Sequence, residues 1–150
     1  MSGRVNIGKA APALYQGMIE LDRLAGQALA AAGMAEGFSH LLRLRASQIN
    51  GCAFCIRMHA RDALGSGESA DRVAVLTVWR ETVYFNPLER AALALVEAVT
   101  LIAEGQVEDA VYAEAAAQLS AAQIAAVQWL AVVINGWNRI AIASRYPVGP

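Results

Sequence analysis

The stretch "INGCAFCIRMHARD", residues 49–62, holds both cysteines of this 150-residue chain and one of its two histidines. Asn50-Gly51 is a pair that commonly interrupts a helix, so a new helix is expected to begin near Cys52. Within a helix, Cys52, Cys55 and His59 follow one another at spacings of three and four residues, which places their side chains on one face. The stretch therefore predicts a helix whose first turns carry two thiols and an imidazole side by side.

This helix face suits thiol chemistry. A cysteine attacks a peroxide or a disulfide only as the thiolate, and the partial positive charge at a helix N-terminus favours that anion. His59 can accept the proton of Cys55 as a general base, or pair with the thiolate as an imidazolium. Cys52 is near enough to condense with a sulfenic acid on Cys55, and a reductant must then reopen the resulting disulfide.

Three other interpretations of the cysteines stay open. They can be small core residues, as free cysteines often are. They can be zinc ligands together with His59, with His40 as the fourth ligand, since His40 is the only other histidine. They can also belong to a thioredoxin-like motif, although the βαβ pattern that accompanies such a motif is missing. The CxxC spacing favours redox chemistry over these alternatives.

Outward from this stretch the sequence predicts helices, with no strand alternation of useful length. Apolar positions at helical spacing, capping residues and glycine stops divide the chain. The expected helices cover about 12–33, 36–48, 52–64, 69–79, 87–103, 107–118 and 121–144, and residues 1–10 look irregular. The predicted fold is therefore all-α, with about six to seven helices in a single domain that spans residues 1–150.

Two of these helices begin at strong sequence signals. Asn86-Pro87-Leu88-Glu89 and Ser120-Ala121-Ala122-Gln123 both match the capping box, in which the first and fourth residues bond to each other's backbone. The apolar positions also predict the core. The expected apolar face of the first helix carries Leu14, Met18, Leu21, Leu24 and Leu29, and the core candidates of the second helix are Phe38, Leu41, Leu42 and Leu44.

Composition narrows the functional classes. Hydrophobic residues make up 57% of the chain and the mean hydropathy is +0.38. The most apolar segment, residues 124–143, is interrupted by Gln128, Asn135, Asn138 and Arg139, which argues against a membrane span. We expect Asn135, Asn138 and Arg139 to be buried and bonded to helix ends or across a subunit boundary. So much apolar surface on a small chain predicts contacts between subunits.

The net charge and the N-terminal segment indicate which partners and which cellular location to expect. The net charge is −1, so electrostatics give no reason to expect a nucleic acid or an anionic membrane as partner. Residues 1–10 lack the apolar run of a secretory signal, and a cytoplasmic location is expected. In a reducing compartment a CxxC pair is typical of redox or metal-binding function rather than of a permanent crosslink.

The residues around the cysteines resemble a known family. "LLRLRASQINGCAFCIRMHARDA", residues 41–63, closely resembles the signature of the alkylhydroperoxidase AhpD-like group within the carboxymuconolactone decarboxylase family. The likeness extends to "VWRETVYFNPLERAALALVEAVT" at 78–100 and "NGWNRIAIASRYPVG" at 135–149. It implies an AhpD-like all-helical fold, homo-oligomers such as trimers or hexamers, and an antioxidant peroxidase activity in which the CxxC pair cycles between dithiol and disulfide.

Transferred to this chain, the resemblance implies that Cys55 is the attacking thiol, Cys52 the resolving thiol and His59 the base of a proton relay. Relatives often carry a glutamate twelve residues before the first cysteine, where this chain has His40. We expect His40 to take over that role, with Glu36 one turn earlier as an alternative and a broken relay as another. The implied partners are a hydroperoxide and an external dithiol, for which a lipoyl-bearing protein is a candidate, and no bound cofactor or metal is implied.

Two further functions stay open, and several residues have structural expectations of their own. The family's other named activity is lactone decarboxylation, which generally does not depend on a CxxC pair, and a third possibility is a non-catalytic, redox-sensing oligomer. We expect Arg57 to point to solvent and Phe54 to pack in the core. The tryptophans Trp79, Trp129 and Trp137 are expected in the core or an interface, and Glu81 and Glu89 as partners of Arg45, Arg80 or Arg90.

Overall fold

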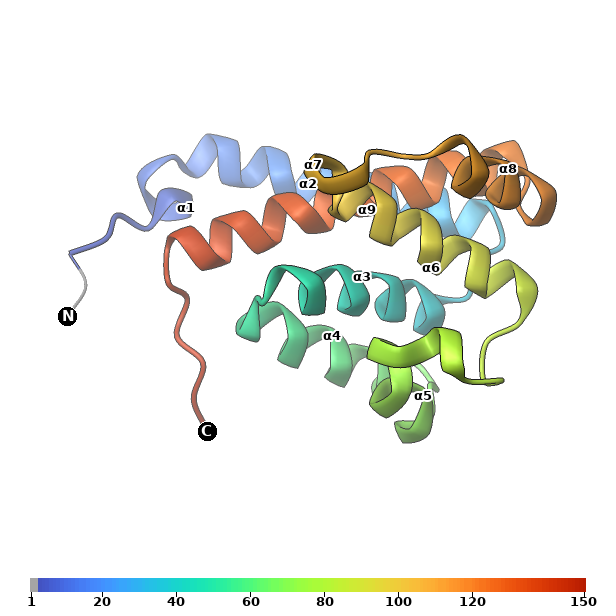
Figure 1. Ribbon diagram of the computed structural model, residues 1–150. Helices are drawn as coiled ribbons and strands as arrows, with labels where there is room; N and C mark the ends of the chain where they lie inside the picture. The colour runs from blue at the N-terminus through green and yellow to red at the C-terminus, as the bar shows by residue number, and fades with distance from the viewer. Residues whose placement is uncertain (1–2) are drawn as a thin grey trace.

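The computed structural model describes residues 3–150, and these residues form helices but no β-strand, which confirms the all-α prediction (Figure 1). None of the helices within this range is both long and apolar enough to cross a membrane. In chain order the elements are α1 (Ile7–Ala10), α2 (Pro12–Ala31), α3 (Glu36–Asn50), α4 (Ala53–Gly65), α5 (Ala70–Val75), the 3-10 helix η1 (Leu76–Glu81), α6 (Pro87–Thr100), α7 (Ile102–Gly105), α8 (Asp109–Gln118) and α9 (Ala121–Ala143).

The expected six to seven helices are too few, because residues 3–150 contain nine α-helices in addition to η1. Two of the extra elements, α1 and α7, are single turns of four residues. The N-cap Asn6, whose side chain accepts a hydrogen bond from the Lys9 N–H, organises α1 in a region expected to be irregular. Such turns depend on local hydrogen bonds and not on a long apolar period, so helical periodicity does not reveal them.

Both predicted capping boxes are present. The Glu89 N–H donates to the Asn86 side chain at 2.9 Å, and the Asn86 N–H donates to the Glu89 carboxylate at 3.0 Å. Ser120 and Gln123 make the same reciprocal pair, at 3.1 Å and 2.9 Å. These bonds satisfy backbone donors that a helix start would otherwise leave unpaired, and so they set where α6 and α9 begin.

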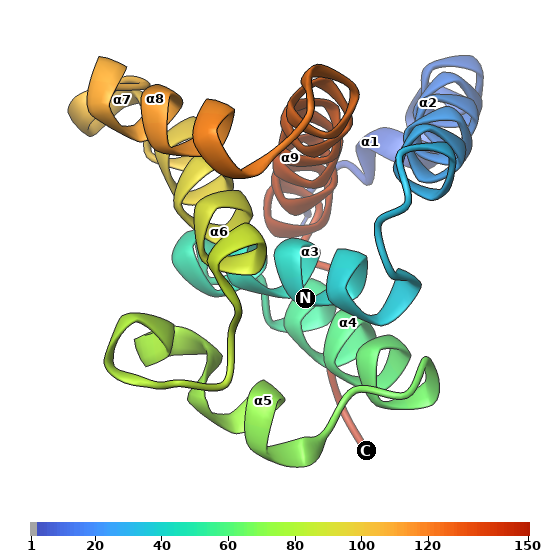
Figure 2. The ribbon, with the colours of Figure 1, turned by 90° about the vertical axis from the view of Figure 1, so that its right-hand side faces the viewer.

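The long helix α9 is the centre of the molecule. Viewed along its length, it lies between α2 and α6, with α3 beneath it and α4 beneath α3 (Figure 2). The core fills the space between α2, α3, α6 and α9, and its predicted residues on α3, from Phe38 to Leu44, are buried. The largest aliphatic side chains withdrawn from solvent on these four helices are Leu29, Leu41, Leu42, Leu44, Leu93, Leu95, Val96, Val127, Leu130 and Ile134.

The apolar face expected on the first helix is only partly covered. Leu29 at the end of α2 is 2% exposed, but Leu14 and Leu24 are 76% and 47% exposed. The helical period of the sequence is therefore present in α2, while residues 3–150 leave part of this apolar face exposed to solvent. On α9 the outward-facing Trp129 and Val132 are also about half exposed. Exposed apolar surface of this kind is typical of protein contacts.

Glu97 on α6 joins three elements through one carboxylate. The Arg45 Nε on α3 and the Trp79 Nε1 on η1 both donate to its Oε1, at 2.7 Å and 2.8 Å, and Arg80 binds its Oε2. Burial alone would raise the pKa of Glu97, but the hydrogen bonds from Arg45, Trp79 and Arg80 outweigh it, and the pKa of this carboxyl is lowered. Glu97 therefore stays ionised and holds η1 against α3 and α6.

The predicted ion pairs of Arg45, Arg80 and Arg90 with Glu81 or Glu89 are largely wrong. Arg45 and Arg80 pair with Glu97 and not with Glu81 or Glu89. Glu89 instead accepts from Arg72, whose Nη2 lies 2.8 Å from the Glu89 Oε1. These pairings join residues far apart in sequence, so charge spacing along one helix could not indicate them.

Candidate active site

The two cysteines form a disulfide at the start of α4. Cys52 is the N-cap residue, outside the helix that was expected to include it, and its Sγ accepts the Cys55 N–H at 3.3 Å. The cysteines are 1% and 2% exposed. The helix start therefore acts directly on the Cys52 sulfur, where a backbone N–H and the helix dipole would favour a thiolate after reduction.

The turn before Cys52 confirms the predicted break at Asn50-Gly51. Gly51 ends α3 in the left-handed region with φ 69°, which a glycine adopts without the penalty that a side chain brings. The Cys52 N–H then donates back to the Ser47 carbonyl at 3.0 Å. The tight turn sends the chain back along α3, and α3 and α4 pack against each other as a helical hairpin (Figure 1).

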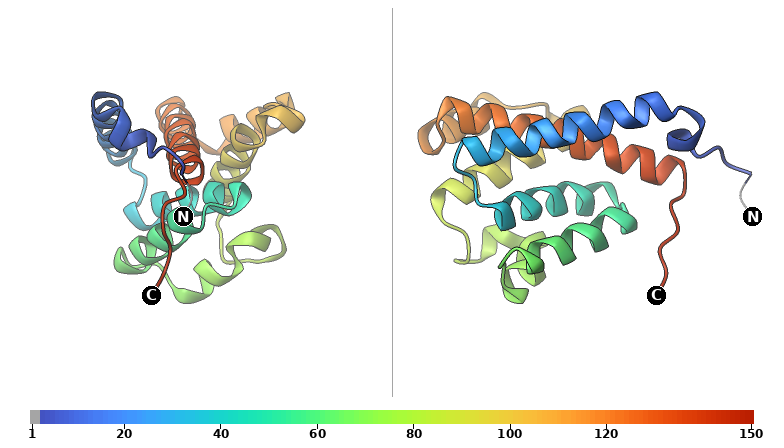
Figure 3. Two further views of the ribbon diagram at one scale, coloured as in Figure 1. Left: turned by 90° about the vertical axis from the view of Figure 1, so that its left-hand side faces the viewer. Right: turned by 180° about the vertical axis from the view of Figure 1, so that it is seen from behind.

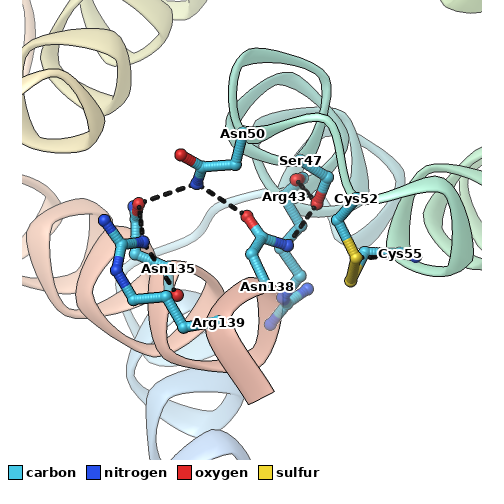
Figure 4. The surroundings of a disulfide bond; sticks show 8 residues. All are labelled: Arg43, Ser47, Asn50, Cys52, Cys55, Asn135, Asn138 and Arg139. Carbon is cyan, nitrogen blue, oxygen red and sulfur yellow. Dashed lines mark hydrogen bonds between the residues drawn. A yellow bond between two sulfur atoms is a disulfide. The ribbon is translucent and has the colours of Figure 1, made fainter. Parts of the chain in front are cut away.

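A network of uncharged side chains ties this turn to α9 (Figure 4). The Asn50 Nδ2 donates to the Oδ1 atoms of Asn135 and Asn138, both at 2.9 Å, and the Asn138 Nδ2 donates to the Ser47 Oγ at 3.0 Å. Asn138 is fully buried, and both of its partners, Asn50 and Ser47, lie in the last turn of α3. The expectation that it is buried and bonds to a helix end is therefore confirmed. Arg139 is exposed, contrary to expectation, and donates to Asn135 from outside.

A cavity of about 300 Å³ lies next to Cys55 and His59. Its remaining wall is largely apolar and comes from α2, α9 and the segment after α9. Asp22 and Arg43 are the charged side chains that line it. Its apolar lining residues are Tyr15, Ile19, Phe54, Met58, Ile134, Trp137, Ala141 and Tyr146.

The C-terminal segment forms one side of this cavity. It leaves α9 and runs past the start of α4 (Figure 3). The Tyr146 ring packs edge-on against Phe54 at a centroid distance of 5.2 Å, and Arg57 donates to the Gly149 carbonyl. Arg57 is half-buried and bonded to the C-terminal segment, contrary to the expectation that it points to solvent. Phe54 is half-buried and packs against the small core cluster of Cys52, Cys55 and Ala141, so its expected core packing is confirmed in part.

The tryptophans have three different environments. Trp79 is 4% exposed and belongs to the core, as expected. Trp137 packs edge-on against Tyr15 at 5.3 Å and lines the cavity. Trp129 is 53% exposed on α9. Only the first of the three environments follows from helical spacing, because the other two depend on which surface lies opposite each ring.

The hairpin of α3 and α4 brings the two histidines together. The His40 Nδ1 lies 3.4 Å from the His59 Nδ1, and the two ring planes are 30° apart. His59 is 6% exposed and His40 is half-buried. The structure therefore places Cys55 and His59 on one cavity and puts His40 in contact with His59, so that a proton on one ring can pass to the other.

The surroundings keep both imidazoles neutral. Burial lowers the pKa of His59 to about 3, with smaller contributions from the positive charge of Arg43 and from His40 in acid, where it is protonated. Burial also lowers the pKa of His40, followed by Arg43, while the carboxylates of Asp62, Glu36 and Asp22 act in the opposite direction. Neutral imidazoles have a free lone pair, which can accept a proton or bind a metal ion.

Two charged residues of this site were missed by the sequence analysis. The Asp62 Oδ2 lies 3.9 Å from the His59 Nδ1 and 4.0 Å from the His40 Nδ1. Arg43 lines the cavity from α3. The sequence did contain a signal for both residues, because Asp62 follows His59 by three residues and Arg43 follows His40 by three. On a helix this spacing makes side chains neighbours. The alternative residue Glu36 is exposed in the first turn of α3.

Known proteins resemble this chain in sequence and fold. The model of the carboxymuconolactone decarboxylase family matches residues 14–98. The uncharacterized protein YdfG of Bacillus subtilis (strain 168) is 36% identical over 143 residues, which are 95% of each chain. A crystal structure from Agrobacterium tumefaciens has 36% sequence identity and a TM-score of 0.87, over 97% of this chain and 99% of that chain. That protein is of unknown function, with a suggested role in antioxidant defence as AhpD.

Proposed function

Because the chain belongs to the carboxymuconolactone decarboxylase family, we propose that it is an AhpD-like, thiol-dependent peroxidase that reduces hydroperoxides with its two cysteines. The observation that carries the proposal is the shared cavity of Cys55 and His59, with Cys52 already bonded to Cys55 and His40 in contact with His59. These groups are what a dithiol–disulfide cycle with proton transfer needs.

The first step oxidises one sulfur. His59 takes the proton of the Cys55 thiol, because the charge of the thiolate beside the imidazolium offsets the burial that lowers the pKa of His59 in the disulfide form. The thiolate then attacks the terminal oxygen of the hydroperoxide. The O–O bond breaks, Cys55 becomes a sulfenic acid, and the alkoxide leaves as an alcohol once it receives a proton. The proton taken up by His59 is available for this purpose, and the 3.4 Å contact with His40 offers a path for its exchange.

The second step closes the disulfide. The Cys52 sulfur attacks the sulfenic acid, the S–O bond breaks, and water leaves. An external dithiol then reduces the disulfide and becomes a disulfide itself. Attack on the Cys55 sulfur expels Cys52 as a thiolate, and the Cys55 N–H that already points at Cys52 Sγ stabilises this leaving group. A leaving thiol of lower pKa departs faster.

The cavity supports an organic substrate. Its lining is mostly aromatic and aliphatic, so the apolar part of a hydroperoxide can occupy it while the peroxide oxygens face Cys55. The reductant is proposed to be a dithiol with an apolar arm, such as a lipoyl group, because it must reach the same sulfur. Homo-oligomers would cover the exposed apolar surface of α2 and α9, including Leu14 and Trp129.

A stopped-flow assay with cumene hydroperoxide tests the function. The chain is first reduced, the reductant is removed, and the hydroperoxide is added. We expect one equivalent of peroxide to be consumed per chain, with formation of the Cys52–Cys55 disulfide identified by mass spectrometry. Added dihydrolipoamide should then give continuous turnover. A reduced chain that consumes hydroperoxide no faster than free cysteine would contradict the proposal.

Variants of the histidines test the relay. His59→Gln is expected to slow the peroxide step by about 100-fold, the usual scale for loss of a general base. His40→Leu removes the second proton acceptor and is expected to slow it about tenfold. His40→Glu restores the glutamate expected from the family resemblance and should keep a rate close to that of the unchanged chain. Equal rates for His40→Leu and His40→Glu would show that position 40 takes no part in proton transfer.

A further inference from the structure

We propose that His40, His59 and Asp62 form a binding site for a divalent transition-metal ion such as Zn²⁺. The three residues can each offer one ligand atom, and the atoms that lie near one another are the Nδ1 atoms of the two histidines and the Oδ2 of Asp62. His40 is on α3, while His59 and Asp62 are one turn apart on α4, so the helical hairpin fixes the set. The proposed peroxidase cycle uses no metal, and the inference does not depend on it.

The distances fit a metal ion. Two nitrogens that bind one tetrahedral Zn²⁺ at about 2.0–2.1 Å lie about 3.3–3.4 Å apart, and the two Nδ1 atoms are 3.4 Å apart. The Asp62 oxygen is 3.9 Å and 4.0 Å from these nitrogens. The point equidistant from the three atoms is about 2.2 Å from each, close to the Zn–N and Zn–O distances in proteins.

The ligands differ in how firmly they are held. The side chains of His59 and His40 are 8% and 17% exposed, so packing holds both rings in place. The Asp62 side chain is 46% exposed and can turn inward by a few tenths of an ångström to complete the site. Two rigid nitrogens and one adjustable oxygen make a site with little to reorganise on binding.

Charge and protonation also favour a cation. His40, His59 and Asp62 line a second cavity, whose other charged lining residues are Arg23, Arg43, Asp22 and Glu36. Three carboxylates thus stand against two arginines. The local charge is therefore negative before an ion binds. A neutral imidazole offers a metal ion the lone pair of the ring nitrogen that carries no proton.

The ligand types select the kind of ion. Imidazole nitrogens suit Zn²⁺, Cu²⁺, Ni²⁺ and Fe²⁺, whereas Mg²⁺ and Ca²⁺ prefer oxygen ligands alone. Three protein ligands leave further positions for water on the side of the second cavity, which Asp22, Arg43 and Met58 also line. An ion here would occupy both Nδ1 atoms and so prevent proton transfer between them, a consequence that rests on the proposed function.

Metal binding is measured on the untagged, disulfide-bonded chain, because free thiols and affinity tags bind zinc themselves. Isothermal titration with Zn²⁺ should show one ion per chain, with no competition from excess Mg²⁺, and Co²⁺ should give a visible spectrum without a thiolate charge-transfer band. His40→Ala and Asp62→Asn should each weaken Zn²⁺ binding by about 100-fold, since even loss of an outer partner costs 10–100-fold.

Asp22→Asn is the matched control, because it removes the same charge as Asp62→Asn from the same cavity but removes no ligand. We expect it to weaken binding only a few-fold. The proposal is overturned if the unchanged chain binds no Zn²⁺ saturably, if Asp62→Asn binds as well as the unchanged chain, or if Asp22→Asn loses as much as Asp62→Asn. Circular dichroism of each variant confirms that the helices are intact, and Asp62 is exposed enough for its variant to fold.

Discussion

Cys55→Ser is expected to lose peroxide reduction by at least about 1,000-fold, because a serine hydroxyl is not ionised at neutral pH and has no adequate base to activate it here. The reason for choosing Cys55 is its position. It lines the cavity together with His59, whereas Cys52 faces a different depression of the surface. The measurement is the rate of cumene hydroperoxide consumption by the reduced chain under single-turnover conditions.

Cys52→Ser is the matched control, since it makes the same replacement of sulfur by oxygen three residues away. It should still consume one equivalent of peroxide and gain one oxygen atom at Cys55, but form no disulfide and fail to turn over. The hydrogen bond from the Cys55 N–H to the Cys52 sulfur makes the opposite assignment chemically reasonable. If Cys55→Ser consumes one equivalent and Cys52→Ser consumes none, the roles of the two cysteines are reversed.

Glu97→Ala is expected to destabilise the chain by about 3 kcal/mol, the usual cost of removing one partner from a buried ionic network. The substitution leaves the Trp79 N–H and the Arg45 guanidinium without their shared acceptor in a largely buried place. Glu97→Gln keeps an oxygen for Trp79 but loses the charge, so we expect a smaller loss of about 1–2 kcal/mol. Urea unfolding followed by circular dichroism measures both.

The pH dependence of the stability difference between the unchanged chain and Glu97→Gln distinguishes the effect of the charge from the effect of packing. The folded chain lowers the pKa of Glu97 below its ordinary value of 4.5, so its contribution to stability is present above that value and declines as the pH falls through the folded pKa. The gap between the unchanged chain and Glu97→Gln should therefore shrink in acid. A gap that is constant with pH, or an alanine variant within about 0.5 kcal/mol of the unchanged chain, would contradict this account.

The helices with clear local signals are the part of the fold that the sequence predicts well. The capping boxes at Asn86 and Ser120 and the break at Gly51 depend on a few neighbouring residues, and all three are in place. Short elements such as α7 carry no such signal. The ionic network of Glu97 could not be predicted, because its partners come from α3 and η1 and meet only after the chain has folded.

The candidate site, like the fold, could be predicted from the sequence only in part. Cys52, Cys55 and His59 follow from spacing within one helix, and the resemblance adds His40, but their catalytic roles remain predictions. The contact of His40 with His59 requires the hairpin of α3 and α4. The cavity wall supplied by Tyr15 and by the C-terminal segment is tertiary as well. Spacing along a helix indicates which side chains share a face, and folding decides what lies opposite that face.

The attachment of the cysteine-bearing turn to α9 has a further consequence, because Asn50, Asn138 and Ser47 carry no net charge. Neither acid nor high ionic strength weakens amide and hydroxyl hydrogen bonds as it weakens ion pairs. This network and the ion pairs of Glu97 therefore respond differently to salt. High ionic strength should leave the attachment of the cysteine-bearing turn unchanged, so hydrogen exchange of the backbone amides of Asn50 and Cys52 should not depend on the salt concentration.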